Sequence, residues 1–391
     1  METTNRPDTL DVERAVRERY SKGAQSREAA LCCPVSYDPG HLAAIPSEVL
    51  ERDYGCGDPS PHVRPGDTVL DLGSGGGKVC FIASQIVGPG GRVIGVDMND
   101  EMLELARRSA PLVAGAIGHD NVTFRRGRIQ DLSLDMDLLD AWLEEHPVRG
   151  VEDLPVLQDA SDRLRRERPM IADASIDIVI SNCVLNLVRE SDRRSLLQEI
   201  FRVLRVGGRL AICDIVSDES VPDRLKADPE LWSGCVSGAF QEGELLSEME
   251  QAGFHGITLD TWSEQPFRVV EGIEFRAVTV TARKGKQGVC LDANQAVIYK
   301  GPWKQVEDDD HHVLRRGERS AVCAKTYRIL TDAPYADQII PIPPRTEIPE
   351  KARHPFDCSR TAARHPKETK GEDYTATSDG EGACCPPGSC C

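Results

Sequence analysis

The sequence predicts an α/β fold in which helices cover both faces of a mostly parallel sheet. Three observations support this fold. Short β-branched runs alternate with helical stretches from Asp67 to about Val216, a glycine-rich loop directly follows the first run, and two more strand-like runs come after a long excursion. With 391 residues, of which 40% are hydrophobic, the chain is long enough for two or three domains.

Each expected strand and helix is predicted by a local pattern in the sequence. The runs that predict parallel strands are residues 68–72, 92–98, 121–127, 176–181 and 209–216. Residues 99–110 and 191–208 predict crossover helices, because each stretch begins with capping residues and repeats apolar residues at helical spacing. The second helix is expected to stop at Gly207 and Gly208. Residues 257–262 and 274–284 predict late strands that close the sheet along an antiparallel edge.

Composition excludes several classes of protein. The formal net charge is −17, and no stretch concentrates Lys and Arg as a phosphate-binding surface requires, so nucleic acid is not an expected partner. No run approaches the roughly 20 apolar residues of a membrane helix, and residues 1–20 are polar, which predicts a soluble, cytoplasmic protein without a membrane partner. The 14 cysteines should stay reduced there, which favours metal, metalloid or redox chemistry over a disulfide framework.

The segment VLDLGSGGGKVC places Gly73, Gly75 and Gly77 between a strand and a helix, where backbone N–H groups at the helix start are available to a ligand. Asp97 ends the next predicted strand 22 residues after Gly75, close to the interval at which a Rossmann-type acid meets ribose hydroxyls. A packing turn is the alternative interpretation. The spacing G-x-G-x-G differs from the G-x-G-x-x-G of pyrophosphate sites, which favours S-adenosylmethionine over NAD.

Some cysteines are interpreted as structural. Cys80, on the helix after the glycine loop, and Cys213, inside the strand LAICDIV, are expected to fill the core, as free cysteine commonly does. Cys290, Cys323 and Cys358 are isolated in the sequence and receive no role.

Four other cysteines have neighbours that are not typical of a core. Cys33 lies in LCCPVSYDP, Cys56 in DYGCGDPS, Cys183 in SNCVLNLV and Cys235 in LWSGCVSGAF. Cys56 and Cys235 adjoin glycines, and Cys183 lies at the carboxyl edge of the fourth strand, beside the expected cofactor crevice. Each alone is equally compatible with packing, but four at one cleft predict a functional cluster.

The motif D-L-G-S-G-x-G, Asp97 and the N-x-x-x-N run at 182–186 resemble class I S-adenosylmethionine-dependent methyltransferases, whose Rossmann-like sheet we therefore expect. The resemblance implies that the glycine loop lines the methionine part of the cofactor, that Asp97 binds the ribose hydroxyls, and that Met98, Ile129 and Gln130 flank the adenine. The implied set of cofactor-binding residues is Asp71, Gly73, Ser74, Gly75, Gly77, Asp97, Met98, Ile129, Gln130 and Asn182.

The motifs D-Y-G-C-G, S-N-C-V-x-N-L-V and S-G-C-x-S-G-A resemble arsenite methyltransferases, over about residues 31–284. The resemblance implies that Cys183 and Cys235 bind the metalloid and that Cys56 is a third ligand and redox partner. Cys33 is implied to form a disulfide with Cys56, although Cys32 is an equal candidate, and Tyr54 is implied to position the methyl group. The expected partners are arsenite or its glutathione conjugates and a thiol reductant, either thioredoxin or glutathione.

The domain organisation follows from these assignments. We expect a polar leader over residues 1–30, an S-adenosylmethionine-binding methyltransferase domain over 31–216 and an arsenic-binding region with the closing strands over 217–285. Within the methyltransferase domain, residues 132–172 form an acidic insertion with a short helix that ends at Pro147. Residues 286–345 predict a small C-terminal module in which VIYKGPW and AKTYRIL form strands, and 346–391 predict a disordered, cysteine-ended tail.

Two rival functions remain open from the sequence. One is a class I methyltransferase of an organic small molecule, in which the cysteines are incidental. The other is a non-catalytic, thiol-rich protein that binds a metalloid. Calorimetry with S-adenosylmethionine separates this second rival from an enzyme, because a protein that only binds a metalloid has no reason to bind the methyl donor.

Overall fold

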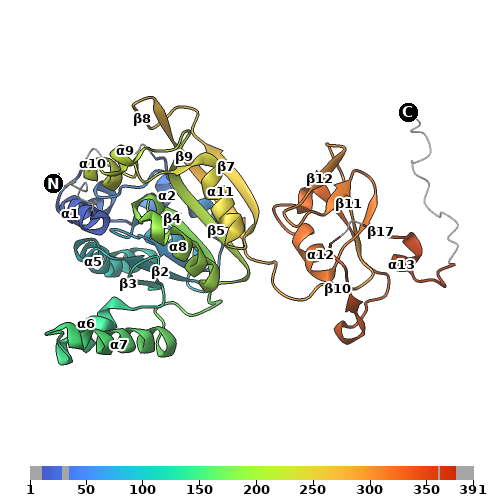
Figure 1. The fold of residues 1–391 in the computed structure, drawn as a ribbon, viewed down its shortest axis with the longest axis horizontal. Helices are drawn as coiled ribbons and strands as arrows, with labels where there is room; N and C mark the ends of the chain where they lie inside the picture. Colours follow the sequence, from blue (N-terminus) through green and yellow to red (C-terminus); the bar gives the residue numbers. More distant parts are fainter. Residues whose placement is uncertain (1–10, 29–34, 360–361, 376–391) are drawn as a thin grey trace, which may run out of the picture. The chain divides into compact units, whose positions relative to one another are not determined.

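The computed structural model describes residues 11–28, 35–359 and 362–375 (Figure 1). It divides the chain into a first unit that ends at Gly285 and a second unit that begins at Lys286. Cys32, Cys33 and the four cysteines of the tail lie outside the described residues. Within the described part, no helix is both long enough and apolar enough to cross a membrane.

The first unit contains one sheet with the strand order β3-β2-β1-β4-β5-β9-β7, in which β6 also pairs with β5 and β8 with β9. The strands are β1 (Thr68–Leu72), β2 (Arg92–Asp97), β3 (Val122–Arg126), β4 (Ile176–Asn182), β5 (Leu204–Ser217), β6 (Phe240–Gln241), β7 (His255–Trp262), β8 (Arg268–Val270) and β9 (Ile273–Arg283). Strands β1 to β5 pair in parallel, whereas β9 pairs antiparallel with β5 and β7. The predicted parallel sheet with an antiparallel edge is therefore confirmed.

Helices lie on both faces of this sheet. The helices of the first unit are α1 (Val12–Gln25), α2 (Pro39–Leu42), α3 (Ser47–Glu51), η2 (Ser60–His62), α4 (Lys78–Val87), α5 (Asp100–Ile117), α6 (Met136–Glu145), η3 (Val151–Asp153), α7 (Leu154–Glu167), η4 (Leu185–Leu187), α8 (Glu190–Val203), α9 (Asp223–Lys226), α10 (Pro229–Ser233) and α11 (Glu242–Gln251). Helices α4 and α5 lie on one face, and α8 and α11 lie on the other. Alternate residues of β1 point to opposite faces, as the strand period requires: Val69 belongs to the core cluster that includes residues of α4 and α5, and Leu70 and Leu72 belong to the cluster that includes residues of α8 and α11.

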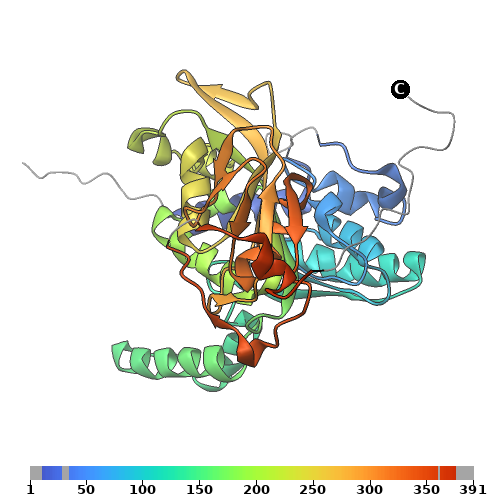
Figure 2. The same ribbon diagram turned by 90° about the vertical axis from the view of Figure 1, so that its right-hand side faces the viewer.

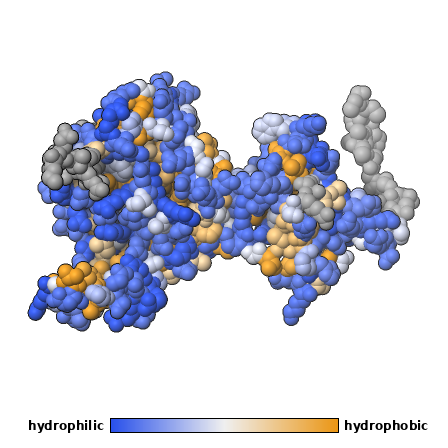
Figure 3. Space-filling model, in the orientation of Figure 1, coloured by the Kyte–Doolittle hydropathy of each residue, from blue (hydrophilic) through white to orange (hydrophobic). Residues whose placement is uncertain are grey.

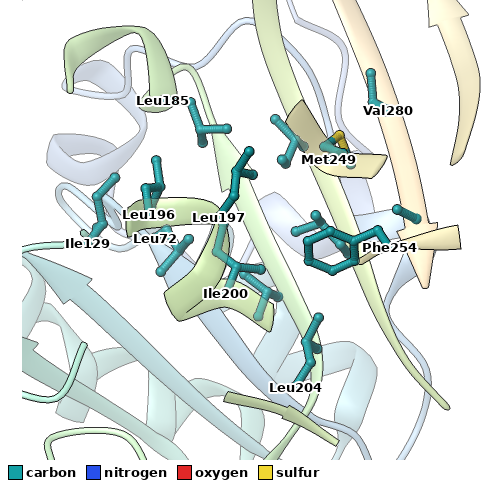
Figure 4. Packing of buried hydrophobic residues seen from close by; sticks show 14 of the residues in the cluster. Leu72, Ile129, Leu185, Leu196, Leu197, Ile200, Leu204, Met249, Phe254 and Val280 are labelled. Atoms are coloured by element: carbon teal, nitrogen blue, oxygen red, sulfur yellow. The ribbon is translucent and has the colours of Figure 1, made fainter. Parts of the chain in front are cut away.

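The core between the sheet and α8 carries the β-branched and leucine side chains that predicted these elements (Figure 4). Leu196, Leu197 and Ile200 of α8 are at most 1% exposed and meet Leu72 of β1. Burying side chains of this kind stabilises the fold by about 1.5–3 kcal/mol each. The core thereby fixes β1 next to β4, which is the pair of strands whose carboxyl ends carry the glycine loop and Cys183.

One predicted boundary is wrong. The sequence predicted a helix over 191–208, but α8 ends at Val203 and residues 204–208 already belong to β5. The ammonium group of Lys284, just after β9, donates to the carbonyls of Phe201 at 2.6 Å and Leu204 at 2.7 Å. Lys284, which is distant in the sequence, therefore donates hydrogen bonds to carbonyl groups at the end of α8, and these groups do not need the backbone N–H groups of a longer helix.

The insertion before β4 is a helical hairpin that projects from the sheet (Figure 2). The short helix predicted before Pro147 is confirmed as α6, whereas α7 was not predicted. Val148, Val151, Leu154 and Val156 are exposed where α6 connects to α7. Figure 3 shows apolar residues gathered at the tip of the insertion.

The second unit contains small sheets and two short α-helices among its described residues. Its elements are β10 (Leu291–Asp292), β11 (Ala296–Tyr299), β12 (Gln305–Glu307), β13 (Val313–Arg315), β14 (Arg319–Ala321), α12 (Ala324–Leu330), η5 (Ala336–Gln338), β15 (Ile339–Ile342), η6 (Glu350–Ala352), β16 (His354–Pro355), β17 (Ala362–Ala363) and α13 (Pro366–Lys370). The prediction of disorder from residue 346 is wrong for the described residues, because β16 pairs with β10 and β17 with β14. The prediction of a strand for AKTYRIL is also wrong: it is α12, capped by Cys323.

Candidate active site

A cavity opens at the carboxyl ends of β1 and β4, the neighbouring strands at which the strand order of the sheet reverses. With its open mouth it encloses about 1100 Å³. Nine of the ten residues that the sequence assigned to cofactor binding line it: Asp71, Gly73, Ser74, Gly75, Asp97, Met98, Ile129, Gln130 and Asn182. Gly77 does not line the cavity. A Cβ atom at Gly77 would lie 2.8 Å from the ring of Phe124, so this glycine allows close packing between α4 and β3.

The glycine loop presents its backbone to the cavity at Gly75. This residue has φ of 50°, and no heavy atom lies within 4 Å of the place where its Cβ would stand. Its N–H donates to Oδ2 of Asp97 at 2.8 Å, and Oδ1 of Asp97 accepts from the N–H of Asn99 at 2.8 Å. The loop is thus tied to the acid that ends β2.

The donors and walls of this cavity fit S-adenosylmethionine. The buried hydroxyl of Ser74 has no hydrogen-bond partner among the described residues, which leaves a donor for a ligand. Asp97 offers a carboxylate at the end of β2, and burial raises its pKa. Met98 and Ile129 form apolar parts of the wall. A ligand with a charged amino acid end, a diol and a flat base matches this arrangement of polar and apolar groups.

Asp71 should make the stability of the first unit depend on pH. Burial raises the pKa of Asp71 to about 7, although the thiol of Cys80 donates to its Oδ2 at 3.1 Å. Because the folded pKa is higher than the unfolded value of about 3.9, the stabilisation from protonated Asp71 is present at low pH and is lost as pH rises through 7. Asp71→Asn removes this ionisation. We expect the melting temperature of the variant, relative to the parent, to increase between pH 5 and pH 8 in differential scanning calorimetry; a constant difference would contradict the assignment.

Three of the predicted thiols meet at the end of this cavity. The sulfur atoms of Cys56 and Cys183 and a carboxylate oxygen of Asp214 all lie within 4.8 Å of one another. Cys235 Sγ donates to the carbonyl of Cys183 at 3.0 Å, and Cys56, Cys183 and Cys235 belong to one buried cluster. Cys183 also lines the cofactor cavity, so the cluster and the cavity share a wall.

The backbone at two of these cysteines is strained. Cys183 has φ of 61° and Cys235 has φ of 59°, in the left-handed region that residues other than glycine seldom adopt. Such strain costs on the order of 1–3 kcal/mol per residue and persists only where surrounding contacts impose it. For Cys183 the contacts include the N–H of the cysteine itself, which donates to the carbonyl of Cys213 at 2.8 Å. The strain turns two thiols from separate segments toward one point.

Asp214 and Asn186 hold the turn that follows Cys183. The carboxylate of Asp214 accepts from the N–H of Leu185 at 2.9 Å, from Nδ2 of Asn186 at 2.8 Å and from the N–H of Ile215 at 2.8 Å. Burial raises the pKa of Asp214 to about 6, and these donors hold it below the value that burial alone would give. The sequence analysis did not identify Asp214, although the run C-D-I at the end of a parallel strand was a usable signal.

Two thiols of the cluster, those of Cys56 and Cys183, are protonated at pH 7. Burial raises the pKa of Cys56, and burial together with the neighbouring thiols raises the pKa of Cys183 well above its usual value. A divalent metal that needs preformed thiolates would have to displace these protons at a high cost.

Asn182 ties the loop of Cys56 to the end of β4. Its Oδ1 accepts from the N–H groups of Cys56 at 2.9 Å and Gly57 at 3.1 Å, and its Nδ2 donates to the carbonyl of Gly57 at 2.7 Å and to the hydroxyl of Tyr37 at 3.1 Å. The resemblance placed Asn182 among cofactor residues. It lines the cavity, and the structure adds this second task.

Replacing Asn182 by Asp should loosen Cys56. The carboxylate keeps both acceptor contacts but loses the amide that donates to Gly57 and Tyr37, and it brings a charge beside buried thiols. Since a misplacement of about 1 Å at a reacting centre costs about a hundredfold in rate, we expect the rate of the reaction that the sequence resemblance implies to fall by about that factor. A single-turnover assay of that reaction measures this rate. Unchanged turnover would mean that the four contacts do not position Cys56.

Helix α1, within the segment that the sequence described as a polar leader, covers part of the site. The hydroxyl of Tyr20 lies 4.0 Å from Cys235 Sγ, and its ring meets the ring of Tyr54 edge-on with centroids 6.0 Å apart. Tyr54 itself lines the cavity, but its hydroxyl donates to the carbonyl of Gly23 at 2.9 Å and accepts from the N–H of Glu28 at 3.0 Å. The hydroxyl of Tyr54 is therefore bound by the end of α1.

A family model described as a methyltransferase domain matches residues 64–253. Together with the strand order and the cavity, this match shows that the first unit has the fold of class I S-adenosylmethionine-dependent methyltransferases. Arsenite methyltransferases from Aquipseudomonas alcaligenes and Mus musculus are 32% and 30% identical to the chain, over 82% and 86% of it and 88% and 87% of their own lengths. The chain belongs to the arsenite methyltransferase family.

A solved structure agrees with this family. The arsenic (III) S-adenosylmethionine methyltransferase from Chlamydomonas reinhardtii is 25% identical, with a TM-score of 0.54, over 84% of this chain and 100% of that one. A second family model, described as a domain of unknown function, matches residues 286–374. The resemblances stated from the sequence motifs are thus confirmed at the level of family and fold.

Proposed function

We propose that this protein methylates trivalent arsenic while the metalloid is bonded to Cys56, Cys183 and Cys235. The observation that carries the proposal is the buried cluster of these three cysteines, in which Cys183 lines the cofactor cavity. Three thiolates fill the three bonding positions of trivalent arsenic, and soft thiolates select soft centres over hard ions. The membership of the arsenite methyltransferase family supports the same substrate.

Buried, neutral thiols suit this substrate. Arsenous acid carries three hydroxyl groups, and each thiol that forms an S–As bond gives its proton to one hydroxyl, which leaves as water. Three bonds therefore form with release of three waters, and no net proton is taken from or released to solvent. The raised pKa values of Cys56 and Cys183 then impose little penalty, whereas they would disfavour binding of a divalent cation.

The protein contributes orientation to the reaction. S-adenosylmethionine, when bound, supplies an electrophilic methyl group. Bonding to three thiols leaves the arsenic lone pair unshared, so the nucleophile needs no general base. Holding two reactants in a productive geometry can remove on the order of 7–11 kcal/mol from a barrier. The strained turn at Cys183 and the Asn182 anchor of Cys56 serve this purpose.

Methylation leaves arsenic formally pentavalent, and two electrons return it to the trivalent state. We propose that Cys56 and a second thiol, Cys33 or Cys32, supply them by forming a disulfide, which thioredoxin or glutathione then reduces in the cytoplasm. Glutathione conjugates of arsenite are an alternative form of the substrate, because thiol exchange transfers arsenic from one sulfur to another.

The test is incubation of the purified protein with arsenite, glutathione and S-adenosylmethionine, followed by speciation of arsenic and assay of adenosylhomocysteine. We expect methylated arsenic and adenosylhomocysteine to appear together. Binding of S-adenosylmethionine without methylated arsenic would favour an organic substrate, and absence of binding would favour a non-catalytic arsenic-binding protein.

A further inference from the structure

A second group of three cysteines meets in the C-terminal unit. The sulfur atoms of Cys290, Cys323 and Cys358 all lie within 4.8 Å of one another. They come from segments that are far apart in the sequence: Cys290 directly precedes β10, Cys323 caps α12 and Cys358 follows β16. None of them belongs to the catalytic cavity.

The fold of this unit brings the three segments together with defined contacts. Strands β10 and β16 pair antiparallel, and the N–H of Phe356 donates to the carbonyl of Cys290 at 2.8 Å. The ammonium group of Lys325, in the first turn of α12, donates to the carbonyl of Lys286 at 2.9 Å. The strand ladder fixes Cys358 near Cys290, and the lysine fixes the segment before Cys290 against α12.

Core packing does not explain this cluster. The structural cysteines Cys80 and Cys213 are 0% exposed, and each donates or shares a hydrogen bond with a core partner. Cys290 and Cys358 are only half-buried, and Cys323 alone is fully buried. Two half-buried cysteines beside one buried cysteine suit a site that a small ligand enters from solvent.

Cys323 is also an unusual choice for its structural task. Its sulfur accepts from the N–H of Thr326 at 3.3 Å and lies 3.2 Å from the hydroxyl of Thr326. Ser, Thr, Asp and Asn are the residues that cap helices best, and sulfur is a weak acceptor. A serine would therefore satisfy the start of α12 equally well, so capping does not account for the thiol.

We propose that Cys290, Cys323 and Cys358 form a second binding site for a trivalent, thiol-bonding metalloid, separate from the catalytic cluster. The choice of trivalent arsenic as the occupant rests on the proposed function. Each thiol forms one S–As bond and returns one hydroxyl of arsenous acid as water, so no electrons are transferred. Zinc prefers four ligands, and no fourth His, Cys, Asp or Glu atom joins this cluster among the described residues.

The experiment is site-resolved thiol labelling of the full chain in a phosphine reductant. N-ethylmaleimide is added with and without arsenite, and labelling of each cysteine is followed by peptide mass spectrometry. At arsenite tenfold above its Kd, we expect labelling of Cys290 and Cys358 to slow by about tenfold. Unchanged labelling of both residues would overturn the proposal, as would protection by Zn²⁺ without protection by arsenite.

Variants test whether the three thiols act as one site. Cys290→Ser should remove the protection of Cys358, and Cys358→Ser should remove that of Cys290, because a two-thiol site binds more weakly. Both residues are half-buried, so these serines should not unfold the unit. Persistent protection of either residue in the absence of the other would contradict a shared site.

The catalytic cluster provides the control that separates this proposal from the proposed function. In Cys183→Ser, methylation should be lost while arsenite still protects Cys290 and Cys358. If the parent protein methylates arsenite without protecting these residues, only the second site is wrong. If arsenite protects them but is not methylated, only the proposed function is wrong.

Discussion

Replacing Cys183 by Ser should abolish methylation of arsenite while S-adenosylmethionine still binds. Cys183 is the central residue of the cluster, since its sulfur lies within 4.8 Å of that of Cys56 and its carbonyl accepts from the thiol of Cys235. Serine offers a hard oxygen that bonds arsenic weakly against competing water, so the metalloid keeps at most two protein ligands. Because losing its position by about 1 Å already costs about a hundredfold, we expect a loss of at least that size in the rate of methyl transfer.

Two measurements make this prediction specific. Calorimetry should give a Kd for S-adenosylmethionine close to that of the parent, because the backbone N–H of residue 183 still donates to Cys213. The matched control is Cys80→Ser, in which the hydroxyl can donate to Asp71 as the thiol does, outside the cluster. Retention of a tenth of the parent activity by Cys183→Ser would argue that arsenic is not bonded to this residue.

The sequence was most informative where local pattern and position coincide. Cys183 directly follows the strand that contains the run IDIVI, and the carboxyl ends of parallel strands meet at one edge of a sheet, so its place beside the cofactor cavity could be predicted. Cys56 and Cys235 needed the resemblance as well, because they lie in loops whose course depends on distant contacts such as those of Asn182.

Other features were missed although a signal was present. Val12, Val16 and Tyr20 recur at helical spacing, and the valines are buried against Trp232. This pattern could have identified α1 as a helix packed on the site rather than a polar leader. Its polar composition concealed it, because most of its surface faces solvent.

The cluster of Cys290, Cys323 and Cys358 could not be predicted from one sequence. These cysteines are isolated along the chain and share no spacing motif. Long-range contacts bring them together, among them the pairing of β10 with β16 and the contact of Lys325 with residue 286. The strand predicted for AKTYRIL was wrong because the local pattern is ambiguous. Thr326 and Leu330 are buried at helical spacing, but the aromatic and β-branched residues of this segment also suit a strand.

Asp214→Ala should destabilise the first unit and disable the thiol cluster. The variant leaves the N–H groups of Leu185 and Ile215 and the amide of Asn186 without their acceptor, at a cost of about 1–3 kcal/mol each. The variant also removes a destabilising effect. Burial raises the pKa of Asp214 to about 6, and at 1.36 kcal/mol per pKa unit above the ordinary value, ionising this buried acid costs roughly 3 kcal/mol. At about 2 kcal/mol each, the middle of that range, the three lost hydrogen bonds outweigh this gain, so chemical denaturation should show a net loss of about 3 kcal/mol.

The same change should affect chemistry beyond its effect on folding. Without Asp214, the turn that keeps Cys183 at φ of 61° loses the acceptor of the Leu185 N–H and of the Asn186 amide, and relaxation of this strain moves the thiol away from Cys56. Arsenite binding and methylation should therefore fall even at temperatures where the variant is folded. Asp177→Ala is the control. Asp177 lies near the start of β4, at the end of this strand that is farther from Cys183, and its carboxylate accepts from the N–H of Thr68. This control should lower stability yet leave methylation by the folded protein unchanged, whereas equal activity in both variants would show that Asp214 acts on stability alone.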